Sequence, residues 1–177
     1  SWTETGDLNS GGYQMANYGT QTAAGSVGRN SGPLQQVHEQ FNGSSWTETT
    51  DTNDNRQYSK GAGTQTAALV FGGESETELY NGSSWTELSA NINVVRLWAA
   101  GCGESTAALF FGGSPNGAAS SATCESWNGS AWTEVNDMGT ARYFLSGTGS
   151  QTAALAFNGQ STKTTQQFNG TSWTEVN

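Results

Sequence analysis

The chain has 177 residues, of which only 12% are charged and 24 are glycines, and its formal net charge is −9. This charge argues against nucleic acid as a partner, which needs a basic face, and against an anionic membrane surface. No apolar run approaches the roughly 18 residues of a membrane span, so we expect no membrane insertion. Scarce Lys and Leu with common Thr, Trp, Tyr and Phe favour strands and turns, and the composition predicts an all-β fold.

Two strings recur along the chain. SWTET opens it at Ser1, and FNGSSWTETT from Phe41 has copies that begin at Tyr80, Trp127 and Phe168. Between them lies TAAGSVG from Thr22, with copies that begin at Thr66, Thr106 and Thr152. The spacing from the Trp of each WTE string to the first Ala of the next TAA string is 21 or 22 residues, whereas the spacing from that Ala to the following Trp varies from 18 to 25 residues. A string that returns at a steady interval is typical of a repeated structural unit, not of an active site.

In chain order, residues 1–5 are expected to form an extra outer strand, followed by complete units at 6–50, 51–89, 90–136 and 137–177. We predict four strands in each unit. They are the stretch after the Arg position, the apolar run AALVF and its copies, a strand that ends in an aromatic residue, and SWTEV with its copies. The whole chain is then one domain of four-stranded repeats.

Asn-Gly separates the third and fourth strands of every unit. It is the strongest two-residue hairpin signal, because a type I′ turn needs positive φ at both central positions. This turn predicts Tyr80 opposite Ser83 and Trp85 opposite Glu78. Tyr80 and Trp85 would share one face as diagonal neighbours, as would their counterparts in the other units.

Four-stranded units of about 40 to 50 residues are typical of propeller blades. Gly-Gly at 72–73, then Tyr80, Trp85 and Arg96, resemble the kelch repeat. The resemblance covers the whole chain and implies a kelch-like β-propeller. The residues that would form its structural signature are Trp46, Trp85, Trp132, Trp173, Arg56, Arg96 and Arg142.

The sequence also departs from the kelch pattern. The first unit has Val27-Gly28-Arg29 where Gly-Gly is expected and Gly12 where Arg is expected, and the fourth has Asn158-Gly159. The combined pattern GTQTAALAF…FNGTSWTEVN is similar to repeats of tail-fibre and other structural proteins of environmental bacteriophages. That resemblance implies an extracellular or virion-surface part with an adhesive or structural role.

Four complete units are fewer than the six or seven that usually close a kelch-like ring. The last unit has its own SWTEV, so SWTET at the start is redundant as a closing strand. We therefore expect self-association or continuation in a longer chain, with a closed four-blade monomer as the alternative. The chain has no initiator Met, so the numbering is expected to start inside or after a removed segment.

The repeated Glu of WTE could suggest paired catalytic carboxylates, as in glycoside hydrolysis. One such Glu in every unit points instead to structure. Arg56, Arg96 and Arg142 follow it after eight or nine residues, and we expect a Glu–Arg tie between outer and inner strands. The residues concerned are Glu4, Glu48, Glu87, Glu134 and Glu175, with Gly12 leaving the first without a partner.

Other candidate reactive residues indicate no cofactor and no metal. His38 is the only histidine and lacks a nucleophile-elbow pattern, so we interpret it as an ordinary strand residue. The segment 51–55, DTNDN, has Ca²⁺-type ligands but lacks the glycine and terminal glutamate of a calcium loop, and turn chemistry explains it as well. Cys102 and Cys124 are expected two strands apart, about 10 Å, and therefore as free thiols.

Asn42, Asn81, Asn128 and Asn169 each begin an N-x-S/T sequon. They are candidates for glycosylation if the protein is secreted. The turn alone also explains them, because Asn-Gly makes the hairpin and Ser or Thr follows by strand preference.

Aromatic residues cluster at the start of the inner strands. Tyr13 and Tyr143 directly follow the Arg position, and Tyr58 and Trp98 come one residue later. In a propeller they would lie on the face that carries the variable loops 30–36, 74–76, 114–122 and 160–164. A constant scaffold with variable loops on one face is the layout of a binding surface, and aromatic rings suit sugar stacking. The alternative is that these rings only pack between blades.

These observations favour a non-enzymatic, extracellular or virion repeat module for adhesion, with a glycan or another surface as ligand. A purely structural fibre or spacer without ligand is the second hypothesis, and a glycoside hydrolase that uses the Glu residues is a remote third.

Overall fold

The computed structural model describes residues 1–29, 32, 36–160 and 162–176, and the described chain is all β. Its sixteen strands form four antiparallel sheets of four strands each. The strands are β1 (Ala16–Thr20), β2 (Ala23–Val27), β3 (His38–Phe41), β4 (Trp46–Glu48), β5 (Lys60–Thr64), β6 (Ala67–Phe71), β7 (Thr77–Tyr80), β8 (Trp85–Leu88), β9 (Ala100–Glu104), β10 (Ala107–Phe111), β11 (Cys124–Trp127), β12 (Trp132–Val135), β13 (Ser146–Ser150), β14 (Ala153–Phe157), β15 (Thr165–Phe168) and β16 (Trp173–Val176).

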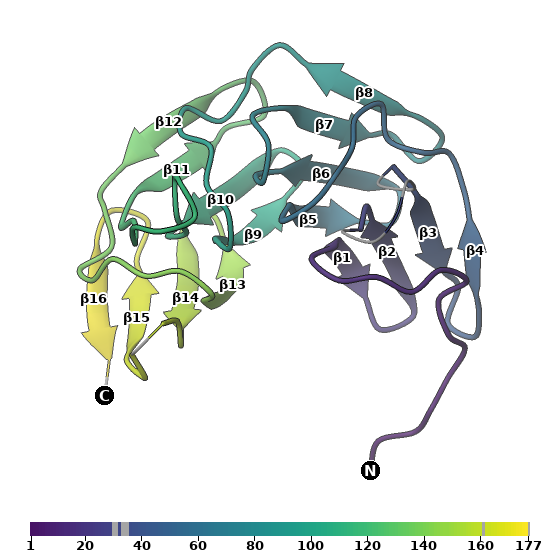
Figure 1. The fold of residues 1–177 in the computed structure, drawn as a ribbon, viewed down its shortest axis with the longest axis horizontal. Coiled ribbons are helices and arrows are strands. Elements are labelled where there is room, and N and C mark those ends of the chain that lie inside the picture. The colour runs from purple at the N-terminus through teal and green to yellow at the C-terminus, as the bar shows by residue number, and fades with distance from the viewer. Residues whose placement is uncertain (30–31, 33–35, 161, 177) are drawn as a thin grey trace.

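Each sheet is one blade of a β-propeller, and its strands follow chain order from the inner to the outer edge. The inner strands β1, β5, β9 and β13 lie side by side in that order around the centre. The outer strands β4, β8, β12 and β16 lie at the periphery, and the blades form an arc that is open between the first and the fourth (Figure 1). The predicted all-β propeller of four-stranded blades is confirmed.

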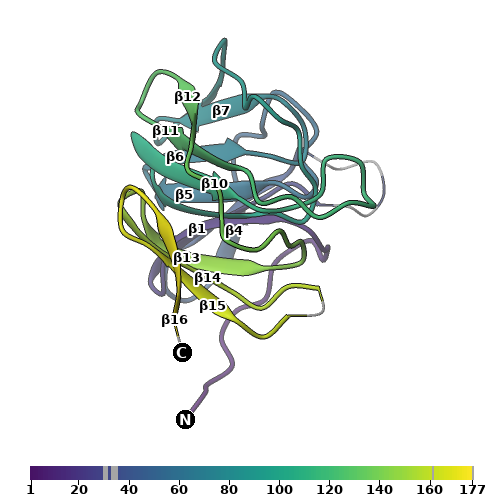
Figure 2. The same ribbon diagram turned by 90° about the vertical axis from the view of Figure 1, so that its left-hand side faces the viewer.

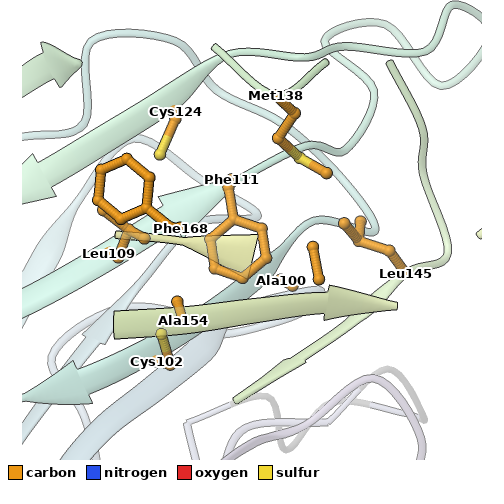
Figure 3. Packing of buried hydrophobic residues seen from close by; sticks show 10 residues of the cluster. Ala100, Cys102, Leu109, Phe111, Cys124, Met138, Leu145, Ala154 and Phe168 are labelled. Carbon is orange, nitrogen blue, oxygen red and sulfur yellow. The ribbon is translucent and has the colours of Figure 1, made fainter. Parts of the chain in front are cut away.

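The blades are held together by apolar residues of neighbouring sheets. Between the third and fourth blades, Leu109 and Phe111 of β10 are buried against Ala154, Ala156 and Phe168 (Figure 3). Between the second and third, Leu69 and Phe71 meet Phe110, Trp127 and Trp132 in the same way. Continuous apolar runs on the second strands follow from this arrangement, because a sheet between two other sheets is covered on both faces.

The predicted aromatic ends of the third strands are confirmed, whereas the inner strands begin four residues after the arginine, β13 at Ser146, and the predicted hairpin register is wrong. Tyr80 lies directly opposite Trp85, with ring centroids 4.9 Å apart, so the loop has four residues and not two. Gly82 has a φ of +93°, whereas Asn81 keeps a negative φ. The Asn81 side chain explains the difference, because its Oδ1 accepts hydrogen bonds from the backbone N–H of Ser83 and of Ser84. The two rings share one face, as expected.

In the first unit the arginine and the glycine of the repeat have exchanged positions: Gly12 stands where the other units have Arg, and Arg29 stands where they have Gly. In the fourth blade Arg142 lies beside Gly159, where an added Cβ would stand 3.2 Å from the Arg142 side chain. In the first blade the roles are reversed, since a Cβ at Gly12 would stand 2.6 Å from Cβ of Arg29. Arg29 is buried like the other arginines. Only one of the two facing segments can supply the arginine side chain, and the facing position is glycine because a Cβ there would press against that side chain.

Residues 1–5, expected as an extra outer strand, form no strand, and Trp2 is fully exposed. They extend past the first blade (Figures 1 and 2), and residues 1–3 and 5 border a hollow with Gln21, Thr22 and Phe41 of that blade. In the described ranges, no helix is long and apolar enough to cross a membrane. Of the variable loops, positions 30–31, 33–35 and 161 lie outside the described residues.

Candidate ligand-binding face

Four equivalent residues at the entry to the inner strands adopt a left-handed backbone conformation. They are Gln14 (φ +64°), Tyr58 (+59°), Trp98 (+54°) and Phe144 (+56°). This conformation is uncommon for residues other than glycine and strained for bulky ones. Hydrogen bonds between blades hold it, because the N–H of Tyr58 donates to the carbonyl of Gln14 and that of Phe144 donates to the carbonyl of Trp98, each at 3.0 Å. Three of these four strained positions carry an aromatic ring.

The rings form one cluster across three blades. Trp98 lies in the middle, with its ring centroid 5.7 Å from Tyr58, 5.6 Å from Tyr143 and 4.7 Å from Phe144. Tyr143 and Phe144 are 5.0 Å apart. Tyr58, Trp98 and Tyr143 are half-buried, whereas Phe144 is 59% exposed. We call Tyr58, Trp98, Tyr143 and Phe144 the aromatic cluster.

In the third and fourth blades the loop between the second and third strands lies beside the aromatic cluster. Leu97 pairs with Ser114 in an isolated bridge, and the N–H of Gln160 donates to the carbonyl of Tyr143 at 2.9 Å. At Gly117 an added Cβ would stand 3.7 Å from the Trp98 ring. The indole N–H of Trp98 is buried and has no hydrogen-bond partner among the described residues. The length-variable part of the repeat therefore forms the surroundings of the cluster.

The structure brings three of the four predicted site residues together and adds one. Tyr13 lies on the first blade, 59% exposed, and among the described rings none of the four cluster members contacts it. Phe144 was missed, although the sequence held a signal for it. It stands two residues after Arg142, as Tyr58 stands two after Arg56 and Trp98 two after Arg96.

The arginines of the repeat bind a different glutamate from the predicted one. Arg56 pairs with Glu78 of β7 at 2.6 Å, and Arg96 pairs with Glu125 of β11 at 3.1 Å, all four side chains being fully buried. Glu87 and Glu134, the expected partners of Arg96 and Arg142, are exposed on the outer strands, as are Glu48 and Glu175, and Glu4 is exposed outside any strand. The predicted Glu–Arg tie is thus wrong, because the buried carboxylate that pairs with the arginine comes from the third strand, whereas the WTE glutamate opposite it on the outer strand is exposed.

The fourth blade satisfies its arginine without a carboxylate. Gln166 occupies the place of Glu78, and Arg142 donates to the carbonyls of Asn158 and Thr164 at 3.2 and 2.8 Å. Asn53 binds Glu78 through its backbone N–H and side-chain amide, whereas its equivalent in the fourth blade is Gly139, next to Gln166. The fourth blade therefore lacks both the buried carboxylate and the asparagine that binds it.

His38 is a buried residue of β3, as interpreted from the sequence. Its Nδ1 accepts hydrogen bonds from Trp85 Nε1 at 3.2 Å and from the Thr49 hydroxyl at 2.8 Å. The ring is therefore neutral with the proton on Nε2, which donates to the Tyr18 hydroxyl at 2.7 Å. Burial lowers the pKa of His38 and raises that of Tyr18. The histidine joins the first blade to the second and has no catalytic partner set.

Both cysteines are free and buried, on β9 and β11 with β10 between them. Burial raises the pKa of each thiol to about 12, so both stay protonated at neutral pH. The predicted strand assignment of Cys102 and Cys124 is confirmed.

The sequon asparagines lie exposed at the tips of the outer hairpins. Each side-chain oxygen accepts two backbone N–H groups, which explains the recurrence of the string without a glycan. Glycosylation of Asn42, Asn81, Asn128 and Asn169 stays a prediction.

The segment 51–55 makes internal and protein contacts: Asn53 and Asp54 donate backbone N–H groups to Glu78, and the Thr52 hydroxyl donates to the Asp54 carbonyl. The part of the chain that the structure describes holds no group of three His, Cys, Asp or Glu residues that could bind a metal ion. In comparisons with known proteins, no family model matches the chain, and no curated protein matches its sequence.

Proposed function

We propose that the protein is a non-enzymatic binding module whose aromatic cluster stacks on the rings of a carbohydrate ligand. The observation that carries the proposal is the strained, left-handed backbone at Tyr58, Trp98 and Phe144. Such strain costs of the order of 1–3 kcal/mol at each residue and is concentrated at functional sites. Glycine would relieve it, yet these three positions hold large rings.

The surroundings also suit a sugar. The exposed Phe144 ring and the half-buried rings of Tyr143 and Trp98 supply flat apolar surface. Asp54, Asn55 and Gln57 of the second blade border a polar hollow with Glu74 and Glu76 of the neighbouring loop. Carbohydrates present apolar ring faces and polar edges, so both kinds of surface contribute to a binding site. Kelch-like adhesion modules of virion or extracellular proteins would use such a face, and we place the protein in that setting as part of the proposal.

Phe144→Asn tests the proposal because asparagine tolerates the left-handed conformation and removes only the ring. We expect it to abolish glycan-array signals and ligand-induced changes in tryptophan fluorescence while the thermal unfolding midpoint is kept. Trp2→Ala is the matched control, since it removes a fully exposed aromatic residue far along the chain from the cluster.

Binding that Phe144→Asn and Trp98→Ala leave unchanged would refute the proposal. Absence of any glycan binding in the wild-type protein would favour the second hypothesis, a structural fibre or spacer. The hydrolase hypothesis is less supported, because the repeated WTE glutamates lie one on each outer strand of separate blades and not around one pocket.

A further inference from the structure

Each blade has two different faces, and each inner blade uses both. The face toward the preceding blade carries the repeated Trp and the aromatic residue opposite it, as with Trp132 and Trp127. In the second and third blades the face toward the following blade carries a Leu and a Phe of the second strand, as with Leu69 and Phe71. In the interfaces of the second with the third blade and of the third with the fourth, the Trp face of one blade therefore meets the Leu-Phe face of the blade before it. The first blade has Gly25 and Val27 at the positions of the Leu and the Phe.

Two kinds of hydrogen bond cross these interfaces, and each kind is found in two of the three. Trp132 Nε1 donates to the hydroxyl of Thr77, the first residue of β7 in the preceding blade, at 3.0 Å. A glutamine at the tip of the inner hairpin adds a second bond, since Gln65 Nε2 donates to the carbonyl of Phe41 at 2.7 Å. Gln151 Nε2 makes the equivalent bond to the carbonyl of Trp127. Both kinds occur together between the first and second blades, where Trp85 Nε1 donates to Nδ1 of His38, the first residue of β3, and Gln65 donates to Phe41, its last residue.

The open arc leaves one face of each kind uncovered. On the fourth blade Leu155 is 37% exposed, whereas its equivalents Leu69 and Leu109 are fully buried. Leu155 also lines a hollow of about 260 Å³ with Thr148 and Gln167. On the first blade Trp46 is only partly buried, and Gln21, the equivalent of Gln65, is exposed beside a hollow that it lines with Phe41 and with residues 1–3 and 5.

We propose that the Leu155 face of the fourth blade binds the Trp46 face of the first blade in a second copy of this chain, head to tail. The two faces are complementary in the way that the second and third blades and the third and fourth blades are. Thr165 begins β15 as Thr77 begins β7, so Trp46 Nε1 donates to the Thr165 hydroxyl across the contact. Gln21 donates to the carbonyl of Phe168, the last residue of the same strand.

A head-to-tail contact uses two different surfaces, so copies assemble into a ring or an extended array. It also covers two exposed sheet faces that would otherwise keep apolar side chains in water. The proposal is independent of the aromatic cluster, which lies at the entry of the inner strands.

Sedimentation equilibrium and native mass spectrometry of the 177-residue chain test the proposal, with concentrations up to about 1 mM to include weak contacts. We expect species at multiples of 18.5 kDa. Trp46→Ala, which damages one face, and Leu155→Asp, which damages the other, should each reduce the assembly to single chains. Circular dichroism should show unchanged sheet content in both, because each residue is partly exposed in the single chain.

Mixing the two variants gives the sharpest outcome. One intact Trp46 face and one intact Leu155 face remain in the mixture, so we expect a dimer of one chain of each kind, although neither variant associates alone. Glu87→Gln, at an exposed residue of β8 in the second blade, is the control and should assemble like the wild type. A wild-type chain that stays single at all concentrations would overturn the proposal, as would a mixture that fails to form the dimer.

Discussion

Glu78→Gln should destabilise the protein far more than Glu87→Gln, although the two residues face each other across β7 and β8. Glu78 is fully buried, and its Oε1 accepts hydrogen bonds from Arg56 Nε at 3.0 Å and Nη2 at 2.6 Å. Its Oε2 accepts two further bonds, from the backbone N–H and the side-chain amide of Asn53, both at 2.8 Å. Glutamine would leave the buried Arg56 charge without a negative partner. Its N–H₂ group would also face either the N–H donors of Arg56 or those of Asn53, where the carboxylate now accepts hydrogen bonds.

The magnitude follows from the burial of both partners. Removal of one member of a buried ion pair costs about 3–5 kcal/mol, because the remaining charge stays in the protein without compensation. For a chain of this size that corresponds to a fall of about 6–20 °C in the unfolding midpoint. Glu87 is exposed on the outer strand, so Glu87→Gln should change the midpoint little.

Urea unfolding followed by circular dichroism, with both variants measured beside the wild type, provides the assay. The double variant Arg56→Met with Glu78→Leu should recover a large part of the loss, since it removes the uncompensated charge along with the pair. Equal midpoints for Glu78→Gln and Glu87→Gln would refute this reasoning.

Three further predictions concern buried residues. Trp132→Ala should cost about 3–5 kcal/mol in urea unfolding because the indole is buried between blades, whereas Trp2→Ala should cost little. Because burial lowers the pKa of His38, the folded state loses stability as pH falls below about 6.5, the unfolded pKa. His38→Gln should flatten that slope in thermal scans between pH 7 and 5.5, and an unchanged slope would contradict the assignment. Cys102 and Cys124 should react with a thiol reagent only on unfolding, and rapid labelling of the native protein would show that the thiols are accessible.

The strand pattern was predictable because each blade repeats the same anchors at nearly constant spacing. Trp85 and its copies begin the fourth strands, and Tyr80 and its copies end the third. The register was missed because the Asn-Gly rule concerns backbone conformation, whereas here the Asn81 side chain caps a longer loop. Sequence reasoning cannot distinguish the two from the dipeptide alone.

The buried ion pairs were not predicted, because the repeated WTE string favours its own glutamate as the partner of the arginine in place of the glutamate on the third strand. Glu39, Glu78 and Glu125 stand two residues before the aromatic end of each third strand, in otherwise dissimilar sequences. That spacing could have identified the partner glutamates. In the fourth unit the same position holds Gln166, and the position of Asn53 holds Gly139, so the two changes also pointed to a contact between these positions. The exchange of Arg29 and Gly12 needed the structure, because two distant strands supply one side chain.

Packing only between successive blades makes the folding of this chain nearly one-dimensional. The stability of such an array is close to the sum of the stabilities of its units and the couplings between neighbours. The outermost units have one coupling each, whereas the second and third have two. Amide hydrogens of β13–β16 and β1–β4 should therefore exchange with solvent before those of β6 and β10, because the terminal blades unfold locally before the two central ones.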